Sequence, residues 1–192
     1  MRELEPVLSE IVTLADGEQV ILRPVRADDK ELLRRGFERL SDVSRYHRFF
    51  AGKGALLDSE LRYLTELDGE THLALVAVRA LDPFDGLGVA RAIRLRDDPA
   101  TFEAALTVVD AHQRRGIGAL LLERLSAAAA ARGARVLRFC VLPSNDAMRA
   151  LMSKAQRPLQ LSRDHDILVY DARIDPSGLR PRRASRDADF PA

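Results

Sequence analysis

The chain has 192 residues and 46% hydrophobic residues, which is enough for one domain with a substantial core. Its 30 basic and 29 acidic side chains nearly cancel, which argues against a nucleic-acid partner held by a general basic field. No apolar run approaches the ~18 residues of a membrane span, and residues 1–6 lack the apolar core of a signal peptide. Cys140 is the only cysteine, so no internal disulfide is possible. We expect a cytoplasmic protein that binds neither nucleic acid nor membrane.

The first third of the chain is predicted to contain a strand and two helices. Residues 20–25 form an apolar run, and residues 28–40 begin with two aspartates that can cap a helix. Residues 41–54 mix aromatic and basic side chains and end in Gly-Lys-Gly, which predicts a loop or helical turn with aromatic anchors. Leucines recur at about one helical turn over residues 59–67, which predicts a second short helix.

The middle of the chain is predicted to form sheet strands. Residues 72–80 and 89–95 are apolar or alternating runs, which indicates an antiparallel hairpin. Pro83 and the Asp-Gly pair at 85–86 predict a long loop between them. A third run, residues 104–109, extends the sheet.

The next segment changes to a helical pattern from Gly116 to Arg132, with Gly133 as the C-cap, followed by a strand over 136–142. A strand, a long helix and a second strand in direct succession predict a right-handed crossover with parallel strands. The fold class is therefore α/β (α+β), a mixed and mostly antiparallel sheet with a central parallel βαβ crossover and flanking helices.

The last part of the chain predicts one helix over residues 143–154 and a final strand over 167–174. Beyond residue 175 the chain is rich in proline and arginine and poor in apolar residues, which predicts disorder. We expect one domain over residues 1–175 and a disordered tail over 176–192.

The predicted junction of strand and helix carries the sequence Gln113-Arg114-Arg115-Gly116-Ile117-Gly118. Glycines at such a junction let backbone N–H groups approach an anion, and the helix dipole favours negative charge there. A dinucleotide fingerprint is excluded because its third glycine position is Leu121, and no triphosphate-loop Gly-Lys-Ser/Thr follows. The pattern Gln/Arg-x-x-Gly-x-Gly/Ala remains, although a tight turn without a ligand would satisfy it equally well.

Residues 104–154 resemble the central part of the GNAT superfamily of N-acetyltransferases. The similar parts are the strand 104–109, the turn, the helix leucines at 121 and 122, and residues 141–145 with Met148 and Leu151. Shorter strings resemble the Pat-like protein-lysine acetyltransferase group. These strings are Arg45–Phe50, Leu73–Val78 and Gly88–Arg91.

The resemblance implies that acetyl-CoA binds in a cleft where two parallel strands splay apart. It implies a pyrophosphate on the amides of residues 114–119 and main-chain pairing of the pantetheine arm with residues 106–108. Asn145 would add a side-chain contact, although a plain helix N-cap explains that residue equally well. The implied cofactor-binding residues are Leu106, Thr107, Val108, Gln113, Arg114, Arg115, Gly116, Ile117, Gly118, Ala119 and Asn145.

The chemistry of acetyl transfer needs a neutral amine, and a free lysine with a pKa of ~10.4 must first lose a proton. Glu103 stands ten positions before Gln113, where the Pat-like group carries its glutamate, so the resemblance implies it as the base. The alternative is a plain exposed charge at the start of a strand.

The other reactive side chains give weaker candidates. His47, His72 and His112 lack a partner at useful spacing, and no metal-ligand spacing is present, so we expect no metal site. Cys140 stands in an apolar run and is expected to be a buried small hydrophobe. The sequence departs from the family at Met152, where a tyrosine is common, and at residues 155–157, which replace Leu-Gly-Phe.

The predicted function is acetyl-CoA-dependent N-acetylation of a primary amine, with protein lysine as a candidate acceptor, by direct attack in a ternary complex. The alternatives are acetylation of a small amine such as an amino sugar, polyamine or antibiotic, and acyl-CoA sensing without catalysis. We expect acetyl-CoA and the amine acceptor as partners, and a monomer or homodimer.

Overall fold

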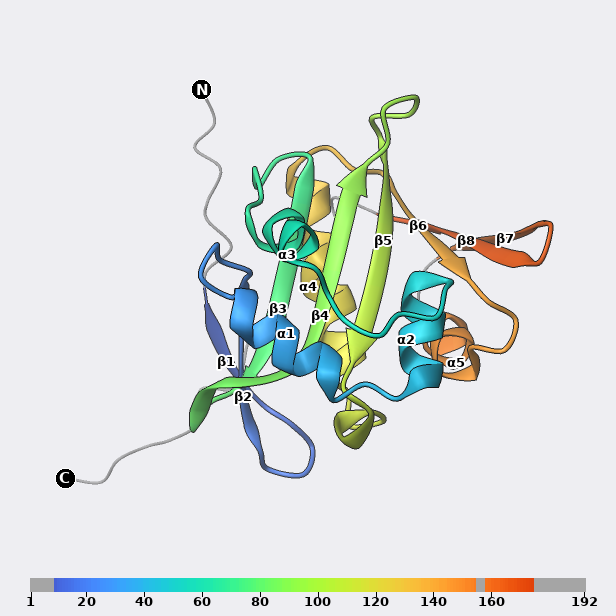
Figure 1. Cartoon of the computed structure of the whole chain (residues 1–192). Coiled ribbons are helices and arrows are strands. Elements are labelled where there is room, and N and C mark those ends of the chain that lie inside the picture. Colours follow the sequence, from blue (N-terminus) through green and yellow to red (C-terminus); the bar gives the residue numbers. More distant parts are fainter. Residues whose placement is uncertain (1–8, 155–157, 175–192) are drawn as a thin grey trace.

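The computed structural model describes residues 9–154 and 158–174, and in this part of the chain a single eight-stranded sheet carries helices on both faces (Figure 1). The strand order is β1-β2-β3-β4-β5-β6-β8-β7, and only β5 and β6 run parallel. This arrangement confirms the predicted fold class. The elements are β1 (Glu10–Thr13), β2 (Gln19–Pro24), α1 (Lys30–Glu38), α2 (Asp42–Phe49), α3 (Asp58–Thr65), β3 (His72–Arg79), β4 (Asp82–Arg94), β5 (Thr101–Val108), a 3₁₀ turn (Asp110–His112), α4 (Ile117–Ala131), β6 (Val136–Val141), α5 (Asp146–Lys154), β7 (Leu159–Asp164) and β8 (Ile167–Arg173).

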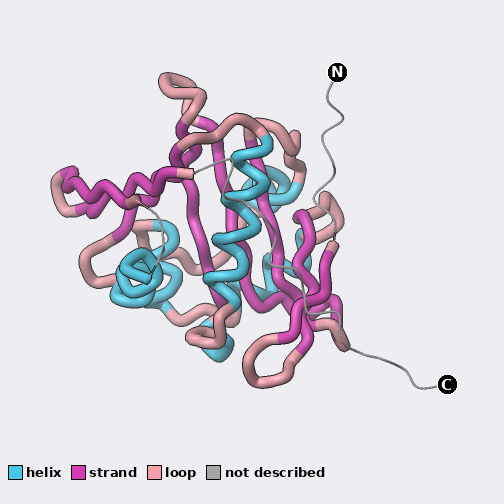
Figure 2. The backbone as a smooth tube through the Cα atoms, turned by 180° about the vertical axis from the view of Figure 1, so that it is seen from behind, coloured by secondary structure: helices cyan, strands magenta, loops and turns pink. Residues whose placement is uncertain are grey.

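The two faces of the sheet have separate apolar clusters because side chains alternate along each strand. On β3, Leu73 and Leu75 pack toward α4, whereas Val76 and Val78 pack toward α1. Figure 2 shows α4 crossing the rear of the sheet, and Figure 1 shows α1 and α3 in front of it. β3 is therefore apolar on both faces and lies in the middle of the core.

The parallel strands β5 and β6 are paired over only three residues each. The last pair joins Glu103 with Arg138, and the rest of β5 continues beside β4 alone. Beyond this pair the two strands separate and leave one edge of β5 uncovered at residues 104–108. We call this opening the fork.

The long loop predicted between β3 and β4 is not observed. The turn has only two residues, Ala80 and Leu81, and β4 already begins at Asp82. Val78 pairs with Gly86 and Arg79 with Asp82, so residues 83–85 bulge out of the ladder. A bulge uses the same proline and glycine signals as a loop, which explains the error.

Of the two alternatives predicted for residues 41–54, the helical one is observed over residues 42–49. These residues form the regular helix α2, whose N-terminus is capped because the Ser41 hydroxyl accepts the Ser44 N–H. The short strands β1 and β7 were not predicted. Residues 155–157 and the tail from residue 176 lie outside the described residues. None of the described helices is long and apolar enough to cross a membrane.

Candidate active site

A cleft of about 1050 Å³ lies where the fork opens, between the end of β5, the N-terminal end of α4, α2 and the start of α5. The predicted cofactor residues gather here. Nine of the eleven line the cleft, namely Leu106, Thr107, Val108, Gln113, Arg114, Gly116, Gly118, Ala119 and Asn145.

The glycine turn has the geometry of an anion site. Gly116 is the N-cap residue of α4 with φ of +92°, a backbone conformation that a side chain would strain. No side chain caps this helix end, and its first turn contains no acidic residue. A Cβ at Gly118 would lie 3.3 Å from the Leu106 side chain, so glycine allows the helix to start close to β5. The free amides and the helix dipole therefore point to a negatively charged ligand.

The side chains of Arg115 and Ile117 do not line the cleft. The Arg115 guanidinium pairs with Asp16 and Glu18 at 2.6 and 2.5 Å, and Ile117 is buried in the core. These two residues can offer a ligand only their main-chain amides.

The side chains of Gln113 and Asn145 both have structural partners. Gln113 donates from Nε2 to the Val108 carbonyl at 3.1 Å and so fixes the end of β5. The Asn145 Oδ1 accepts the Met148 N–H at 3.0 Å, which is the helix-cap role that the sequence left open. The cap leaves the Asn145 amide group as a donor on the cleft wall.

Helix α2 is attached to both sides of the cleft. The Asp110 carboxylate accepts hydrogen bonds from the Ser41 N–H, the Ser41 hydroxyl and the Ser44 hydroxyl. Burial alone would raise the pKa of Asp110, but these bonds outweigh it and the pKa is lowered. On the other side, His47 Nε2 lies 3.1 Å from the Ser144 hydroxyl at the start of α5.

Glu103 is exposed and occupies the last parallel pair, at the point where the fork begins. It stands four residues before Thr107, about 13 Å along the strand, and it does not line the cleft itself. Burial lowers the pKa of Arg48, and the charge of Glu103 partly opposes this effect. Its neighbours Phe102 and Ala104 belong to the cluster packed against α4, so the Glu103 side chain points to the opposite side of the sheet, where α2 lies.

The prediction that Cys140 is buried in the core is wrong, because the residue is half-buried and lies outside the apolar cluster. Its neighbours Phe139 and Val141 pack toward α4, so the thiol faces the Glu103 side of the fork. Burial raises the pKa of Cys140, and the charge of Glu103 raises it further. The thiol is therefore protonated at neutral pH and is a poor nucleophile.

The three histidines considered as alternative bases each contact a neighbouring side chain. His72 is buried, and its Nε2 accepts a hydrogen bond from Arg91 Nη1 at 2.5 Å. Burial and the Arg91 charge lower the pKa of His72 to about 4, so the ring is neutral at pH 7. His112 lies between Arg39 and Arg115. Residues 9–154 and 158–174 contain no group of three potential metal ligands.

Two arginines on the α2 side were not predicted as site residues. Arg48 of α2 lines the cleft, and Arg91 of β4 lies behind it. Arg91 stands between the buried Ala90 and Ala92 on β4. Because side chains alternate along a strand, its side chain points to the other face of the sheet, and this alternation is the one sequence signal for its orientation. Met152 is buried in the core, so this position provides no acid at the cleft.

The fold and cleft define an acyltransferase, and comparison with known proteins agrees. The profile of the Acetyltransferase (GNAT) family matches residues 28–156, and the chain belongs to this family. It is 30% identical over 142 residues to the acetyltransferase PA5475 of Pseudomonas aeruginosa, covering 73% of this chain and 76% of that protein. It is 33% identical to the acetyltransferase Pat of Mycolicibacterium smegmatis over 74% of this chain, and it spans 42% of that longer protein.

Solved structures show the same fold. The GNAT domain of S. lividans PAT superimposes with a TM-score of 0.79 at 30% identity, covering 86% of this chain and 96% of that domain. The Salmonella typhimurium protein yncA, solved with its cofactor acetyl-CoA, has a TM-score of 0.64 at 16% identity, covering 88% of this chain and 99% of yncA. At this identity the second likeness concerns the fold alone.

Proposed function

We propose that this enzyme transfers an acetyl group from acetyl-CoA to the primary amine of a protein lysine, by direct attack in a ternary complex. The observation that carries the proposal is the fork. Pairing between β5 and β6 ends at Glu103 and leaves the edge of β5 uncovered beside the glycine turn. The similarity to two Pat proteins favours lysine as the acceptor.

The proposed cofactor site uses mainly backbone groups. The amides of residues 114–119 bind the pyrophosphate, and the uncovered edge at residues 106–108 pairs with the pantetheine arm as a strand would. A backbone N–H near Val108 polarises the thioester carbonyl. Asn145 contributes its side-chain amide from the opposite wall.

In the proposed reaction, Glu103 accepts the proton of the acceptor ammonium, directly or through one water. The amine nitrogen then attacks the thioester carbon, the carbon–sulfur bond breaks, and the nitrogen loses its second proton to solvent as the amide forms. The coenzyme leaves as a thiolate that takes a solvent proton. Glu103 suits this role because it is exposed at the fork. The raised pKa of Cys140 disfavours a route through an acyl-cysteine.

The proposal also includes the bounds of the domain, the cellular compartment and the oligomeric state. We place the catalytic domain at residues 1–175 and treat residues 176–192 as a tail. A single cysteine suits a reducing cytoplasm, and the domain would act as a monomer or homodimer.

The proposal is tested by the release of coenzyme thiol with acetyl-CoA and a panel of amines. The panel contains lysine peptides, Nε-acetylated control peptides, an amino sugar and a polyamine. Glu103→Gln should lower the rate about 100-fold, as expected for loss of a general base. Glu123→Gln is the matched control, because Glu123 lies on α4, on the other face of the sheet.

Each outcome separates the alternatives. A rate unchanged in Glu103→Gln would remove that residue as the base. Turnover of the amino sugar or polyamine, but not of peptides, would make a small amine the acceptor. Thermal stabilisation by acetyl-CoA without turnover of any amine would support the acyl-CoA sensor.

A further inference from the structure

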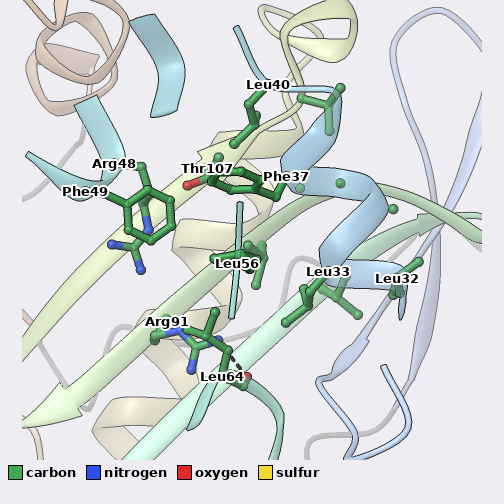
Figure 3. Close-up of a pocket in the computed structure, with 16 residues that line it drawn as sticks. Leu32, Leu33, Phe37, Leu40, Arg48, Phe49, Leu56, Leu64, Arg91 and Thr107 are labelled. Atoms are coloured by element: carbon green, nitrogen blue, oxygen red, sulfur yellow. Dashed lines mark hydrogen bonds between the residues drawn. The ribbon is translucent and has the colours of Figure 1, made fainter. Parts of the chain in front are cut away.

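A second cavity, of about 70 Å³, lies beneath α1, α2 and α3 against β4 (Figure 3). We call it the side pocket. Its walls are mostly leucine, valine and phenylalanine side chains, among them Leu33, Phe37 and Phe49. Arg48 and Thr107 line both the side pocket and the cleft, so the two spaces adjoin at these residues.

The side pocket holds two guanidinium groups and no carboxylate. Figure 3 shows Arg48 beside Phe49 and Arg91 beside Leu64, across the pocket from the leucines of α1. Arg91 is buried and donates to His72 Nε2 at 2.5 Å and to the Leu64 carbonyl at 2.7 Å. Both acceptors are uncharged, because the pKa of His72 is lowered to about 4. The charge of Arg91 therefore has no counterion in the pocket.

Arg48 makes no ion pair within the described residues, and the charge of Glu103 acts on it only from beyond ion-pair distance. Arg48 is half-buried, and its guanidinium lies 5.1 Å from the centre of the Phe49 ring. Burial and the nearby charge of Arg48 together lower the pKa of Arg91 to about 10. Two like charges thus line one mostly apolar pocket, which is unfavourable without a ligand.

Several other partly buried arginines pair with carboxylates, whereas Arg94 and Arg132 donate only to main-chain carbonyls. Arg23, for example, binds the Asp29 carboxylate through two hydrogen bonds of 2.7 Å. The side pocket also contains a third open group, because the Thr107 hydroxyl oxygen is buried without a hydrogen-bond partner. The arginines that do contact a carboxylate include Arg23, Arg115, Arg124 and Arg138.

We infer that the side pocket binds a carboxylate that the acceptor carries close to its reacting amine, between the guanidinium groups of Arg48 and Arg91 and the hydroxyl of Thr107. The inference rests on the proposed function, in which Glu103 accepts the proton from the amine of the same acceptor. Arginine donors suit a planar carboxylate, which they bind with paired N–H groups.

Position and size favour the acceptor as the source of this carboxylate. Arg91 pairs with Ala105 in the ladder, two residues and about 7 Å along β5 from Glu103, so the two ends of a short acceptor can reach both groups. The pyrophosphate of the coenzyme has its own site at the glycine turn. A cavity of 70 Å³ holds roughly two water volumes, which is the size of a carboxylate with one methylene group.

The experiment compares pairs of acceptors that differ only in a carboxylate. Free lysine is compared with cadaverine, and a blocked Gly-Lys-Glu peptide with Gly-Lys-Gln. We expect kcat/KM to be about 10- to 100-fold higher for the carboxylate-bearing member of at least one pair. The pair that shows the preference identifies the source, a free amino acid or an acidic residue beside the lysine. Arg48→Gln should reduce this ratio toward one.

The matched control is Lys53→Gln, because Lys53 is another cation beside the Phe49 ring but lines neither cavity. This variant should keep the preference. Arg48→Lys serves as a second variant that retains the charge and should lose only part of the ratio. Melting curves of all three variants identify any that fail to fold.

Binding of glutarate, measured by calorimetry, tests the side pocket without turnover. We expect binding to the wild type and about tenfold weaker binding to Arg48→Gln. Arginine-dependent glutarate binding without acetylation of any amine would retain the side pocket and refute the proposed function. Acetylation without a carboxylate preference, together with no glutarate binding, would overturn the inference and retain the function. A preference for succinyl-CoA that depends on Arg48, with no acceptor preference, would also overturn it.

Discussion

Arg23 of β2 and Asp29 at the start of α1 form a buried ion pair with two N–O distances of 2.7 Å. Asp29 also accepts the Arg26 N–H at 2.7 Å, so its carboxylate joins the end of the strand to the helix instead of capping the helix by its side chain. Asp29→Ala should lower the free energy of unfolding by about 3–5 kcal/mol, because it leaves Arg23 buried without a partner. Urea unfolding would measure this loss.

The control for this pair is Lys30→Gln, which removes an exposed ion pair with Glu66. We expect a change of at most about 1 kcal/mol. Burial alone would raise the pKa of Asp29, but Arg23 and the Arg26 N–H outweigh it, and the pKa is lowered. The stabilisation is therefore complete above about pH 4 and is lost as the pH falls through the lowered pKa. Equal losses in the two variants would contradict a special role for the buried pair.

His72 predicts a second pH dependence. Its pKa in the folded protein is about 4, against ~6.5 in the unfolded chain. The unfolded state binds the proton first, so stability falls by about 1 kcal/mol per pH unit from pH 6.5 down to pH 4. His72→Gln keeps an acceptor for Arg91 and removes this titration. Unfolding curves at pH 7.5 and 5 should show a smaller decrease for the variant than for the wild type.

Gly116 predicts a specific effect on coenzyme binding. A Cβ at this position meets no atom within 4 Å, so Gly116→Ala introduces backbone strain at φ of +92° without a clash. The strain should cost about 1–3 kcal/mol and should raise KM for acetyl-CoA as the turn relaxes. Gly133→Ala is the matched control, since φ is +86° there and the residue lies at the far end of α4. It should lose similar stability with KM unchanged.

Asp110 predicts a coupling between α2 and the glycine turn. Asp110→Asn weakens the charge-assisted bonds from Ser41 and Ser44, and we expect a loss of about 1–3 kcal/mol with faster hydrogen exchange in α2. Because α2 carries Arg48 and His47 to the cleft, KM should rise for both substrates. Asp42→Asn, at the exposed start of the same helix, is the control. Slow exchange in α2 of the Asp110 variant would refute the coupling.

The sequence predicted the central crossover because its signals are local. The strand before Gln113, the two glycines and the apolar helix that follows each obey a short-range rule, and the observed β5, turn and α4 agree with them. The bulge at residues 83–85 was missed because its register depends on β3, a partner strand that local patterns do not identify. β1 and β7 are short edge strands that rely on pairing more than on their own residues.

The cleft lining that comes from one stretch of the chain could be predicted, whereas the side chains that other elements contribute could not. Residues 106–119 are close in sequence, so a motif could collect them. Arg48 and Arg91 come from α2 and β4, and only the folded sheet brings them to one pocket. Neither arginine forms an ion pair with a carboxylate among the described residues. This depends on how the folded elements pack, so it could not be predicted from spacing along the chain.

The early end of the β5–β6 ladder also affects the stability of the enzyme. Past Glu103 and Arg138, β5 continues with one edge unpaired inside an otherwise continuous sheet. A ligand that pairs with this edge completes the sheet as a strand would, and its binding free energy adds to that of folding. At a concentration 100 times its Kd, such a ligand raises the free energy of unfolding by about 2.7 kcal/mol. The concentration of a coenzyme that binds there would thus shift the equilibrium between the folded and the unfolded enzyme.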